Sequence, residues 1–570
     1  MPNLKLNYIA MSPSTLIPQP PIVPPASFAD GRESDPAAQR LRQLNQIGLA
    51  LSAERDIQRL LELILTKSRE LTRADAGSLY LIQKENDPTT PEEQTLYFRL
   101  AQNDSNPNLN TSMTFAVGPS SLAGYAALTG QLLSFDDVYE LPSDAPYQFN
   151  RSLDKKTGYR TKSMVVVPLK SHSNAVIGVL QLINRKRQQD VLLEDEETVD
   201  SEVLPFDQEL TELAASLASQ AAVALENNIL LKEIENLFDK FVMASSSAIE
   251  DRDPSTSGHS ARVTILTVGL AEAASEATEG PFKDVHFTPD QIKELRYASL
   301  LHDFGKIGVR ENILTKSHKL EPWRFQVVED RLLLLRRSLE TQYANRKVTA
   351  LMEYPREQAL DIVEDLDIQL KAQLESLDSD LALLIRANDP SATFLPDEEY
   401  GRQQEVLQKL SRLTYVDKNG HEQQLLTEEE IRALSVRKGS LTPDEYAQIQ
   451  EHAALSFQFL IQIPWTAEFA NIPNIAHCHH EKLNGKGYPR GITAPDIPLQ
   501  SRMMTVSDMY DALTAADRPY KKAMPVNKAL QILEWEARDG GLDRDVLDLF
   551  VNQKIYRLTE GWHSSCLPNS

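Results

Sequence analysis

Histidine and aspartate side chains recur in one part of this chain at positions where they could bind metal ions together. They are His259, His302, Asp303, His452, His479, His480 and Asp508. A neutral imidazole offers one nitrogen lone pair to a metal, and a carboxylate can bridge two cations with its two oxygens. A dinuclear site of this composition generates a hydroxide nucleophile near neutral pH and offsets the charge that develops on a phosphoryl group. These residue types therefore predict hydrolysis of a phosphodiester.

The adjacent residues His302 and Asp303 are the centre of this prediction, because they supply a nitrogen and an oxygen ligand side by side. A lone buried histidine is more often a hydrogen-bonded core residue than a ligand, so no single member of the group indicates a metal. Their grouping favours the metal interpretation. Cys478 precedes the paired histidines, but we interpret it as a buried, small apolar thiol.

Five segments carry these side chains, and their order resembles the HD-GYP phosphodiesterases, a branch of the HD phosphohydrolases. The segments are Arg252-Asp-Pro254 with Gly258-His-Ser260; Leu301-His-Asp-Phe-Gly-Lys306; Leu441-Thr-Pro-Asp-Glu445 with His452; His479-His-Glu-Lys482 with Gly487-Tyr-Pro489; and Ser507-Asp-Met-Tyr-Asp-Ala-Leu-Thr514 with Arg518-Pro-Tyr-Lys521. An isolated His-Asp dipeptide would be a weak signal, whereas five segments in the family's order make a chance match very improbable.

The resemblance implies a role for each matching residue. One divalent ion would be held by His259, His302, Asp303 and Asp508, and the other by Asp303, His452, His479 and His480, with Asp303 as the bridge. Asp303 and Lys306 would be catalytic, and the substrate contacts would be Lys306, Tyr488, Arg518 and Lys521. Iron or manganese is the metal that the resemblance suggests. Some family members add a third ion through a glutamate, but Ser255 stands at that position here, which favours two.

The region before these segments resembles a GAF domain. The matching strings are Ala74-Asp-Ala-Gly-Ser-Leu-Tyr80, Phe149-Asn-Arg-Ser-Leu-Asp154, Thr157-Gly-Tyr-Arg-Thr161 and Gly178-Val-Leu-Gln-Leu-Ile-Asn184. The resemblance implies an α+β sensor at residues 36–205 with a pocket beside its sheet that takes a small ligand such as a cyclic nucleotide. Asn184-Arg185 and Phe206 match the cyclic-nucleotide signature, but Leu210-Thr211 replaces its Asp-Glu pair, so the ligand stays unknown.

Residues 206–248 form a proline-free stretch in which apolar residues recur every three or four positions, from Leu210 to Phe241. This spacing predicts a long connecting helix, and a continuous helix between sensor and enzyme favours a dimeric coiled coil and a homodimer. The alternative is a helix that packs on its own domain.

A long insertion separates the two halves of the resemblance to HD-GYP enzymes. The first half is residues 249–318, the insertion is residues 319–440, and the second half is residues 441–540, followed by a C-terminal extension at 541–570. Apolar periodicity on both sides of Pro355 predicts a helical hairpin within the insertion, and Tyr415 to His421 predicts a turn between short strands. The insertion could cap the active site, extend a dimer interface or dock a partner, or be a solvated excursion.

Composition narrows the partners and the compartment. The chain has 570 residues, a formal net charge of −23 and two cysteines. An acidic balance argues against a nucleic-acid polymer as partner, the scarcity of cysteine favours the reducing cytoplasm, and no apolar run reaches the length of a membrane span. Residues 1–35 are proline-rich and are predicted to be a disordered tail.

The resulting prediction is a multidomain chain: an α+β GAF domain, a long connecting helix, and an all-α HD domain that carries a mainly helical insertion. Its expected activity is metal-dependent hydrolysis of cyclic di-GMP to linear pGpG and, on further cleavage, GMP, under control of the GAF sensor. The alternatives are a phosphodiesterase for another cyclic mononucleotide or dinucleotide and a non-catalytic adaptor that binds a dinucleotide.

Overall fold

The computed structural model describes residues 36–83, 95–107, 114–253, 258–389, 396–515 and 523–561. The chain divides into two compact units, Met1–Glu235 and Asn236–Ser570. The expected tail at residues 1–35 lies outside the described residues. None of the described helices is both long and apolar enough to cross a membrane.

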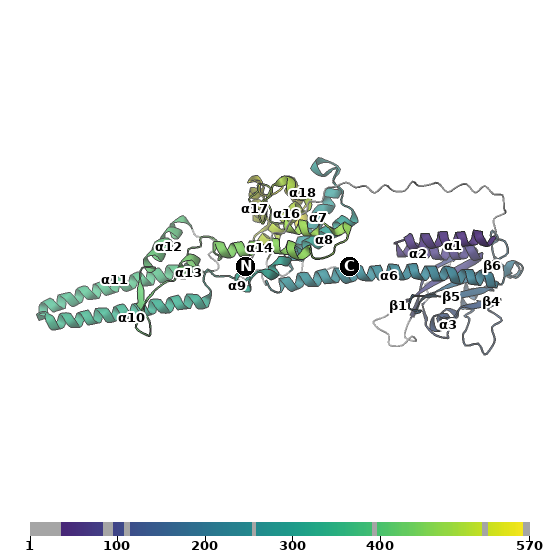
Figure 1. Cartoon of the computed structure of the whole chain (residues 1–570), viewed down its shortest axis with the longest axis horizontal. Helices are drawn as coiled ribbons and strands as arrows, with labels where there is room; N and C mark the ends of the chain where they lie inside the picture. The colour runs from purple at the N-terminus through teal and green to yellow at the C-terminus, as the bar shows by residue number, and fades with distance from the viewer. Residues whose placement is uncertain are drawn as a thin grey trace, which may run out of the picture. The chain divides into compact units, whose positions relative to one another are not determined.

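The first unit is built on an antiparallel sheet in the order β3-β2-β1-β6-β5-β4, with β7 paired to β6 (Figure 1). The strands are β1 (Ala74–Gln83), β2 (Thr95–Asn103), β3 (Thr114–Ala116), β4 (Leu133–Phe135), β5 (Met164–Lys170), β6 (Val176–Lys186) and β7 (Val203–Leu204). The helices are α1 (Pro36–Ala53), α2 (Ile57–Thr72), α3 (Leu122–Thr129), α4 (Ser152–Thr157), α5 (Glu196–Glu202) and the first part of α6 (Gln208–Glu250).

Alternating residues of the central strands bury two separate cores, one on each face of the sheet. Val165 and Val167 of β5 pack with α1, α2 and α6, while Met164 and Val166 pack with α3 on the opposite face. This alternation is the two-residue period of a strand. The α+β class predicted for this unit is confirmed.

Helix α6 packs on its own unit further than the predicted boundary at residue 205 allows. Leu210, Leu217, Ala221 and Leu225 are buried in the core that α1 and α2 share with the sheet. The predicted division at 205/206 is therefore too early, because the apolar periodicity of a helix does not say whether its apolar face packs on its own domain or on a partner.

In its described residues the second unit contains helices and one small β-hairpin. Its core helices are α7 (His259–Ser275), α8 (Pro289–Leu301), α9 (Glu311–Leu314), α14 (Pro443–Leu460), α15 (Ile472–His477), α16 (Leu499–Thr514), α17 (Val526–Arg538) and α18 (Arg544–Asn552), with 3-10 turns η3 (Gly280–Phe282), η4 (Phe304–Gly308), η5 (Ala467–Phe469), η6 (Ala494–Asp496) and η7 (Ile555–Thr559). One cluster of buried side chains joins α7, α8, α15 and α16. The all-α class predicted for this region is confirmed.

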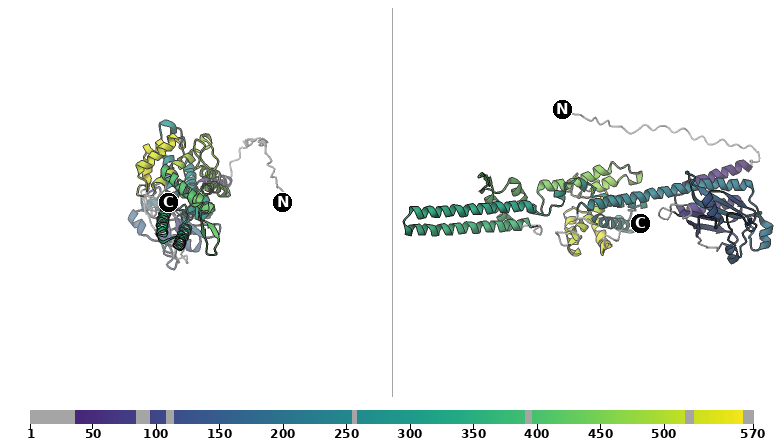
Figure 2. Two further views of the ribbon diagram at one scale, coloured as in Figure 1. Left: turned by 90° about the vertical axis from the view of Figure 1, so that its left-hand side faces the viewer. Right: turned by 90° about the horizontal axis from the view of Figure 1, so that it is seen from below.

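The insertion has a hydrophobic core of its own, which runs from Leu320 to Leu434. It contains α10 (Pro322–Glu353), α11 (Arg356–Asn388), α12 (Asp397–Leu410), the strand pair β8 (Thr414–Val416) and β9 (Glu422–Gln424), and α13 (Glu428–Leu434). Helices α10 and α11 lie side by side as a long hairpin in both views (Figures 1 and 2). The expected hairpin divided near Pro355, and the expected turn between two short strands, are both present.

The C-terminal extension expected at residues 541–570 is wrong for its described part. Val546, Leu547 and Phe550 of α18, and Ile555 after it, are buried in the same core as α7 and α16. Their spacing is that of one apolar helix face, so residues 541–561 belong to the second unit's core.

Candidate metal centre

The His302-Asp303 pair lies where α8 ends and η4 begins, and η4 is pressed against α14. Ser456 of α14 ties the two together: its hydroxyl accepts the Gly305 amide and donates to the His302 carbonyl, both at 2.7 Å. A side chain at Gly305 would place its Cβ 2.0 Å from the His452 carbonyl oxygen. Glycine is therefore required for Asp303 and His452 to approach each other.

His259 opens α7 directly after Gly258, whose φ of 67° suits glycine. Its Nδ1 donates to Asp511 Oδ2 at 2.8 Å, and Arg262 donates to the same carboxylate at 2.7 Å. Asp511 lies on α16, one turn after Asp508, so both carboxylates face α7. This arrangement directs His259 Nε2 toward Asp508 Oδ1, which lies 3.1 Å away.

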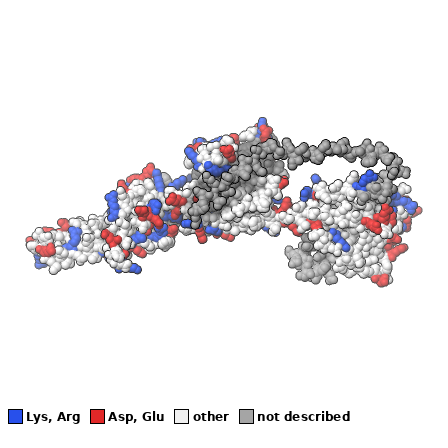
Figure 3. Space-filling view, viewed as in Figure 1, with Lys and Arg blue, Asp and Glu red and all other residues white. Residues whose placement is uncertain are grey.

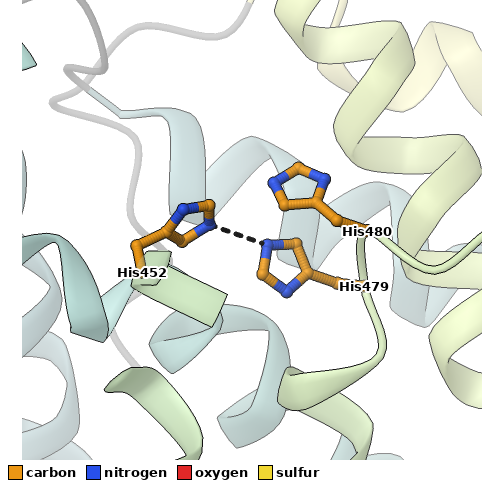
Figure 4. Close-up of side chains that lie close together, drawn as sticks. All are labelled: His452, His479 and His480. Carbon is orange, nitrogen blue, oxygen red and sulfur yellow. Dashed lines mark hydrogen bonds between the residues drawn. The ribbon is translucent and has the colours of Figure 1, made fainter. Parts of the chain in front are cut away.

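His452 lies on α14, whose first turn explains one of the five segments. Thr442 and Glu445 form a capping box in which each side chain bonds the other's backbone amide. His479 and His480 follow α15, and their rings converge with that of His452 (Figure 4). The ligand atoms of these three histidines lie within 4.8 Å of one another, and so do those of His259, His302 and Asp303.

Hydrogen bonds to backbone carbonyls orient three of these rings in the same way. The Nδ1 atoms of His302, His452 and His479 donate to the carbonyls of Ser299, Ile449 and Ala476 at 2.7, 2.6 and 2.5 Å. Because a neutral imidazole carries one N–H, each Nε2 is left with its lone pair toward the centre. This is the tautomer and orientation that a metal-binding histidine needs.

Two observations test whether a cation fits these lone pairs. His302 Nε2 is buried and has no hydrogen-bond partner in the described part of the chain. His452 Nε2 and His479 Nε2 lie 3.3 Å apart, and with both Nδ1 atoms already donating, their two lone pairs face each other. A buried polar atom without a partner is costly, and a cation between the nitrogens removes that cost, so the donor set fits a metal.

The protonation of the rings agrees with this interpretation. Burial lowers the pKa of His480 to about 3 and that of His479 well below its ordinary value, so both rings stay neutral and can bind a metal. His259 differs: burial lowers its pKa, but the bonds with Asp508 and Asp511 raise it to about 10.

The two oxygens of Asp303 face different histidines. Its Oδ2 lies 3.4 Å from His302 Nε2 and 3.8 Å from His259 Nε2, whereas its Oδ1 lies 3.3 Å from His452 Nε2. Asp508 likewise has Oδ1 near His259 and Oδ2 at 3.8 Å from His480 Nδ1. Both carboxylates therefore lie between the two histidine groups, although the sequence assigned a bridging position to Asp303 alone.

Of the remaining residues expected at the site, the structure describes some and leaves others outside the described ranges. Lys306 Nζ lies 2.8 Å from Asp303 Oδ2 and 3.3 Å from Asp253 Oδ2. Burial raises the pKa of Asp303, but Lys306 and the neighbouring histidines together hold it well below its ordinary value. The Tyr488 ring lies 4.7 Å from that of His480. Arg518, Lys521 and Ser255 lie outside the described residues.

Sequence reasoning missed two carboxylates that act on this centre. Asp511 fixes the His259 ring, and Asp253 pairs with Lys306. Both stand inside the quoted segments, but neither the spacing nor the resemblance assigned them a role. The signal available for Asp511 was its position three residues after Asp508, which places both carboxylates on one face of a helix.

A cavity of about 130 Å³ lies beside the sheet of the first unit. Tyr80, Phe149 and Asp154 are among the residues that line it. It has the expected position of a GAF ligand pocket. Two residues of the partial cyclic-nucleotide signature are structural here. Asn184 donates to the Tyr159 hydroxyl and the Arg160 carbonyl, and Phe206 is buried in the core under α6.

Comparison with protein families identifies both units. Residues 56–225 match the GAF domain, and residues 428–546 match the HD domain. The chain therefore carries a GAF domain followed by an HD domain, and the HD domain belongs to a metal-dependent family. The HD match contains His452, His479, His480 and Asp508. His259, His302 and Asp303 precede it and lie on the other side of most of the insertion.

Curated relatives resemble parts of the chain. "3'3'-cGAMP-specific phosphodiesterase 3" of Vibrio cholerae is 42% identical over 102 residues, 18% of this chain and 21% of that protein. "Probable cyclic di-GMP phosphodiesterase" of the same organism is 37% identical over 121 residues, 20% of this chain and 27% of that protein. The chain thus spans about a quarter of these relatives. Among solved structures, a GAF domain of a Coxiella burnetii phosphoenolpyruvate-protein phosphotransferase is 16% identical, with a TM-score of 0.26, covering 36% of this chain and 99% of that one.

Proposed function

We propose that this chain is a metal-dependent phosphodiesterase of the HD-GYP type that hydrolyses cyclic di-GMP to linear pGpG and, on further cleavage, GMP. The observation that carries the proposal is the convergence of inward-facing nitrogens of the histidines on the two oxygens of Asp303. Relatives named as cyclic di-GMP and 3'3'-cGAMP phosphodiesterases support the substrate class.

Each residue would act in a way that follows from its surroundings. His259, His302, Asp303 and Asp508 would hold one divalent ion, and Asp303, His452, His479 and His480 the other, with iron or manganese as the proposed metals. When bound, such ions lower the pKa of a coordinated water and polarise a phosphoryl oxygen. Lys306, buried beside Asp303 and Asp253, would supply positive charge next to the reacting phosphate. Tyr488 would face the substrate from beside His480, and Arg518 and Lys521 would contact its phosphates.

A second substrate deserves a direct comparison, because relatives named for 3'3'-cGAMP match the chain as well as those named for cyclic di-GMP. Purified, metal-reconstituted protein should convert cyclic di-GMP to pGpG with a larger kcat/KM than 3'3'-cGAMP, when products are separated by liquid chromatography. Faster turnover of 3'3'-cGAMP would show that the proposed substrate is wrong, but the proposed phosphodiester hydrolysis would stand. Full metal loading with no turnover of either would leave a non-catalytic binding role.

The proposal extends to control and assembly. We propose that the GAF domain binds a small ligand, for which a cyclic nucleotide is the first candidate, in the cavity beside its sheet, and that α6 pairs with its copy in a homodimer. A cytoplasmic location agrees with the two cysteines of the chain.

A further inference from the structure

A groove of about 1160 Å³ lies where the insertion rejoins the HD domain. Its walls are α13, the loop after it and the first turn of α14, with Lys316 among the lining residues. This volume lies slightly above the usual range of about 300 to 1,000 Å³ for small-molecule sites, so the groove can take a ligand as large as a dinucleotide. No residue predicted from the sequence to bind substrate lines it.

The lining of the groove is positively charged in a chain that is acidic as a whole. The basic lining residues are Lys316, Arg324, Arg432, Arg437 and Lys438, and the acidic ones are Glu429, Asp444 and Glu445. Glu445 is paired with Lys316 at 2.8 Å and Glu429 with Arg324 at 3.1 Å. Arg432 and Lys438 are exposed, and no ion pair engages either of them among the described residues. Two cations are therefore available to an anionic ligand.

An aromatic side chain completes the chemistry of a nucleotide site. Tyr446, whose side chain lines the groove, is 53% exposed. An exposed ring beside cations is the combination on which a base stacks while its phosphate is neutralised.

The groove and the metal centre share helix α14, whose first turn lines the groove and whose third turn carries His452. Glu445 at the groove and His452 at the centre are seven residues apart, so they share one helix face at a separation of about 10 Å. Tyr446 is the next residue of α14 after Glu445, so it also lies within the first turn of the helix that carries His452. A ligand that lies at the centre and extends along α14 would enter the groove.

We propose that this groove binds the half of the cyclic dinucleotide that is not being cleaved, with Arg432 and Lys438 on its second phosphate and Tyr446 stacked on its base. The inference rests on the proposed function and deepens it, because it gives residues at the end of the insertion a part in choosing a dinucleotide over a smaller diester. Selectivity then arises from contacts remote from the reacting phosphorus.

The test is the steady-state kinetics of the full, metal-loaded chain carrying Arg432→Ala and Lys438→Ala together. The matched control is Lys371→Ala with Lys418→Ala, which removes two exposed cations of the insertion that do not line the groove. The substrates are cyclic di-GMP and bis(p-nitrophenyl) phosphate, a small diester that cannot reach the groove. Metal content and thermal midpoint, measured on each variant, check that it is folded and loaded.

Loss of two charge-assisted contacts should raise KM for cyclic di-GMP about tenfold or more, and leave turnover of the small diester within a factor of two of wild type. Tyr446→Ala should act in the same direction, whereas Tyr446→Phe should retain wild-type KM. An unchanged KM for cyclic di-GMP in the double variant, with active wild type, would overturn the groove assignment alone. A wild type that hydrolyses the small diester but no cyclic dinucleotide would overturn the proposed substrate and, with it, the groove.

Discussion

The orientation and tautomer of the clustered imidazoles depend on the groups that their Nδ1 atoms contact. Backbone carbonyls fix the rings of His302, His452 and His479, whereas a carboxylate, Asp511, fixes His259. A carbonyl or carboxylate on the outer nitrogen of a ligand histidine sets its tautomer and raises its basicity. The difference matters, because a side-chain partner can be removed by mutation whereas a backbone carbonyl cannot.

Asp511 should therefore control metal affinity at His259. In Asp511→Asn the His259 ring loses its carboxylate partner, and the affinity for divalent metal should fall about 10- to 100-fold. Isothermal titration of metal-free protein measures this affinity, and activity should recover at high metal concentration. The matched control is Asp284→Asn, whose carboxylate is 87% exposed. Equal affinity in Asp511→Asn and wild type would show that the bond does not orient a ligand.

At the scale of elements, α6 carries a seam whose exposure the sequence could not reveal. From Val223 the seam repeats at alternating four- and three-residue steps through Asn227, Leu230, Ile234, Leu237, Phe241, Ala244 and Ala248. Every one of these positions is exposed, the large apolar ones by 43% to 70%. A strict heptad repeat matches another copy of itself, and a single Asn within it fixes the register.

Ile234→Asp should break the proposed pairing of α6 with its copy. A charge at the centre of the seam opposes a coiled coil, so the chain should shift toward monomer in sedimentation-velocity experiments at micromolar concentration. Leu231→Asp is the matched control: it places the same charge on an exposed apolar residue one step off the seam and should leave the mass unchanged. Equal behaviour of the two variants would assign any dimer to another surface.

The insertion contains a buried lysine, Lys319, whose burial should make the free energy of unfolding depend on pH. The Lys319 ammonium is buried without a hydrogen-bond partner in the described structure, and burial lowers its pKa from 10.5 to about 8. The unfolded chain therefore binds more protons between about pH 8 and 10.5, so stability should rise with pH across that window. Below pH 8, the lowered pKa corresponds to a loss of at most about 3 kcal/mol in the free energy of unfolding.

Lys319→Met should remove this penalty. The variant should be more stable than wild type at pH 7, and its advantage should shrink toward pH 10. Urea unfolding followed by tryptophan fluorescence measures the effect, since Trp323, Trp465 and Trp535 lie in the second unit. A variant less stable than wild type at pH 7 would mean that the ammonium has a partner.

Much of the fold and the site could be predicted, and the limits are specific. The five segments predicted a group of histidines that the structure brings together, because the residue types stand in the family's order along the chain. The segments did not identify Asp511, since its role depends on which residue of α7 faces α16. The pattern from Leu210 to Phe241 predicted a helix, but one apolar period could not separate the part buried on the sheet from the exposed seam. Arg432, on α13, and Lys438, in the loop after it, belong to no motif, and only the folded chain brings them to the same groove.

At the scale of the whole molecule, the surface charge bears on the kind of ligand that the chain can bind. On the face drawn in Figure 3, acidic and basic residues are interspersed over the described surface, and the net charge of the chain is −23. This distribution suits a small anionic substrate and not a nucleic-acid polymer.

Metal removal should lower the thermal stability of the second unit. The proposed ligands lie on α7, α14 and α16 and in the segments after α8 and α15, so bound ions would hold these parts of the second unit together. Chelation should lower the midpoint of thermal unfolding seen by tryptophan fluorescence, and added Mn²⁺ should restore it. Chelation in an Asp303→Asn variant should have a smaller effect. A midpoint that ignores both chelator and metal would argue against a bound cation.

The most direct test of the central claim is product formation from cyclic di-GMP by the metal-reconstituted full chain, compared with Asp303→Asn. Asp303 lies between the two histidine groups, so its replacement should lower kcat by about 100-fold or more, while the wild type releases linear pGpG. Chromatography of the products and metal analysis of both proteins supply the readout. Undiminished turnover in Asp303→Asn, or a fully loaded wild type that leaves cyclic di-GMP intact, would contradict the account.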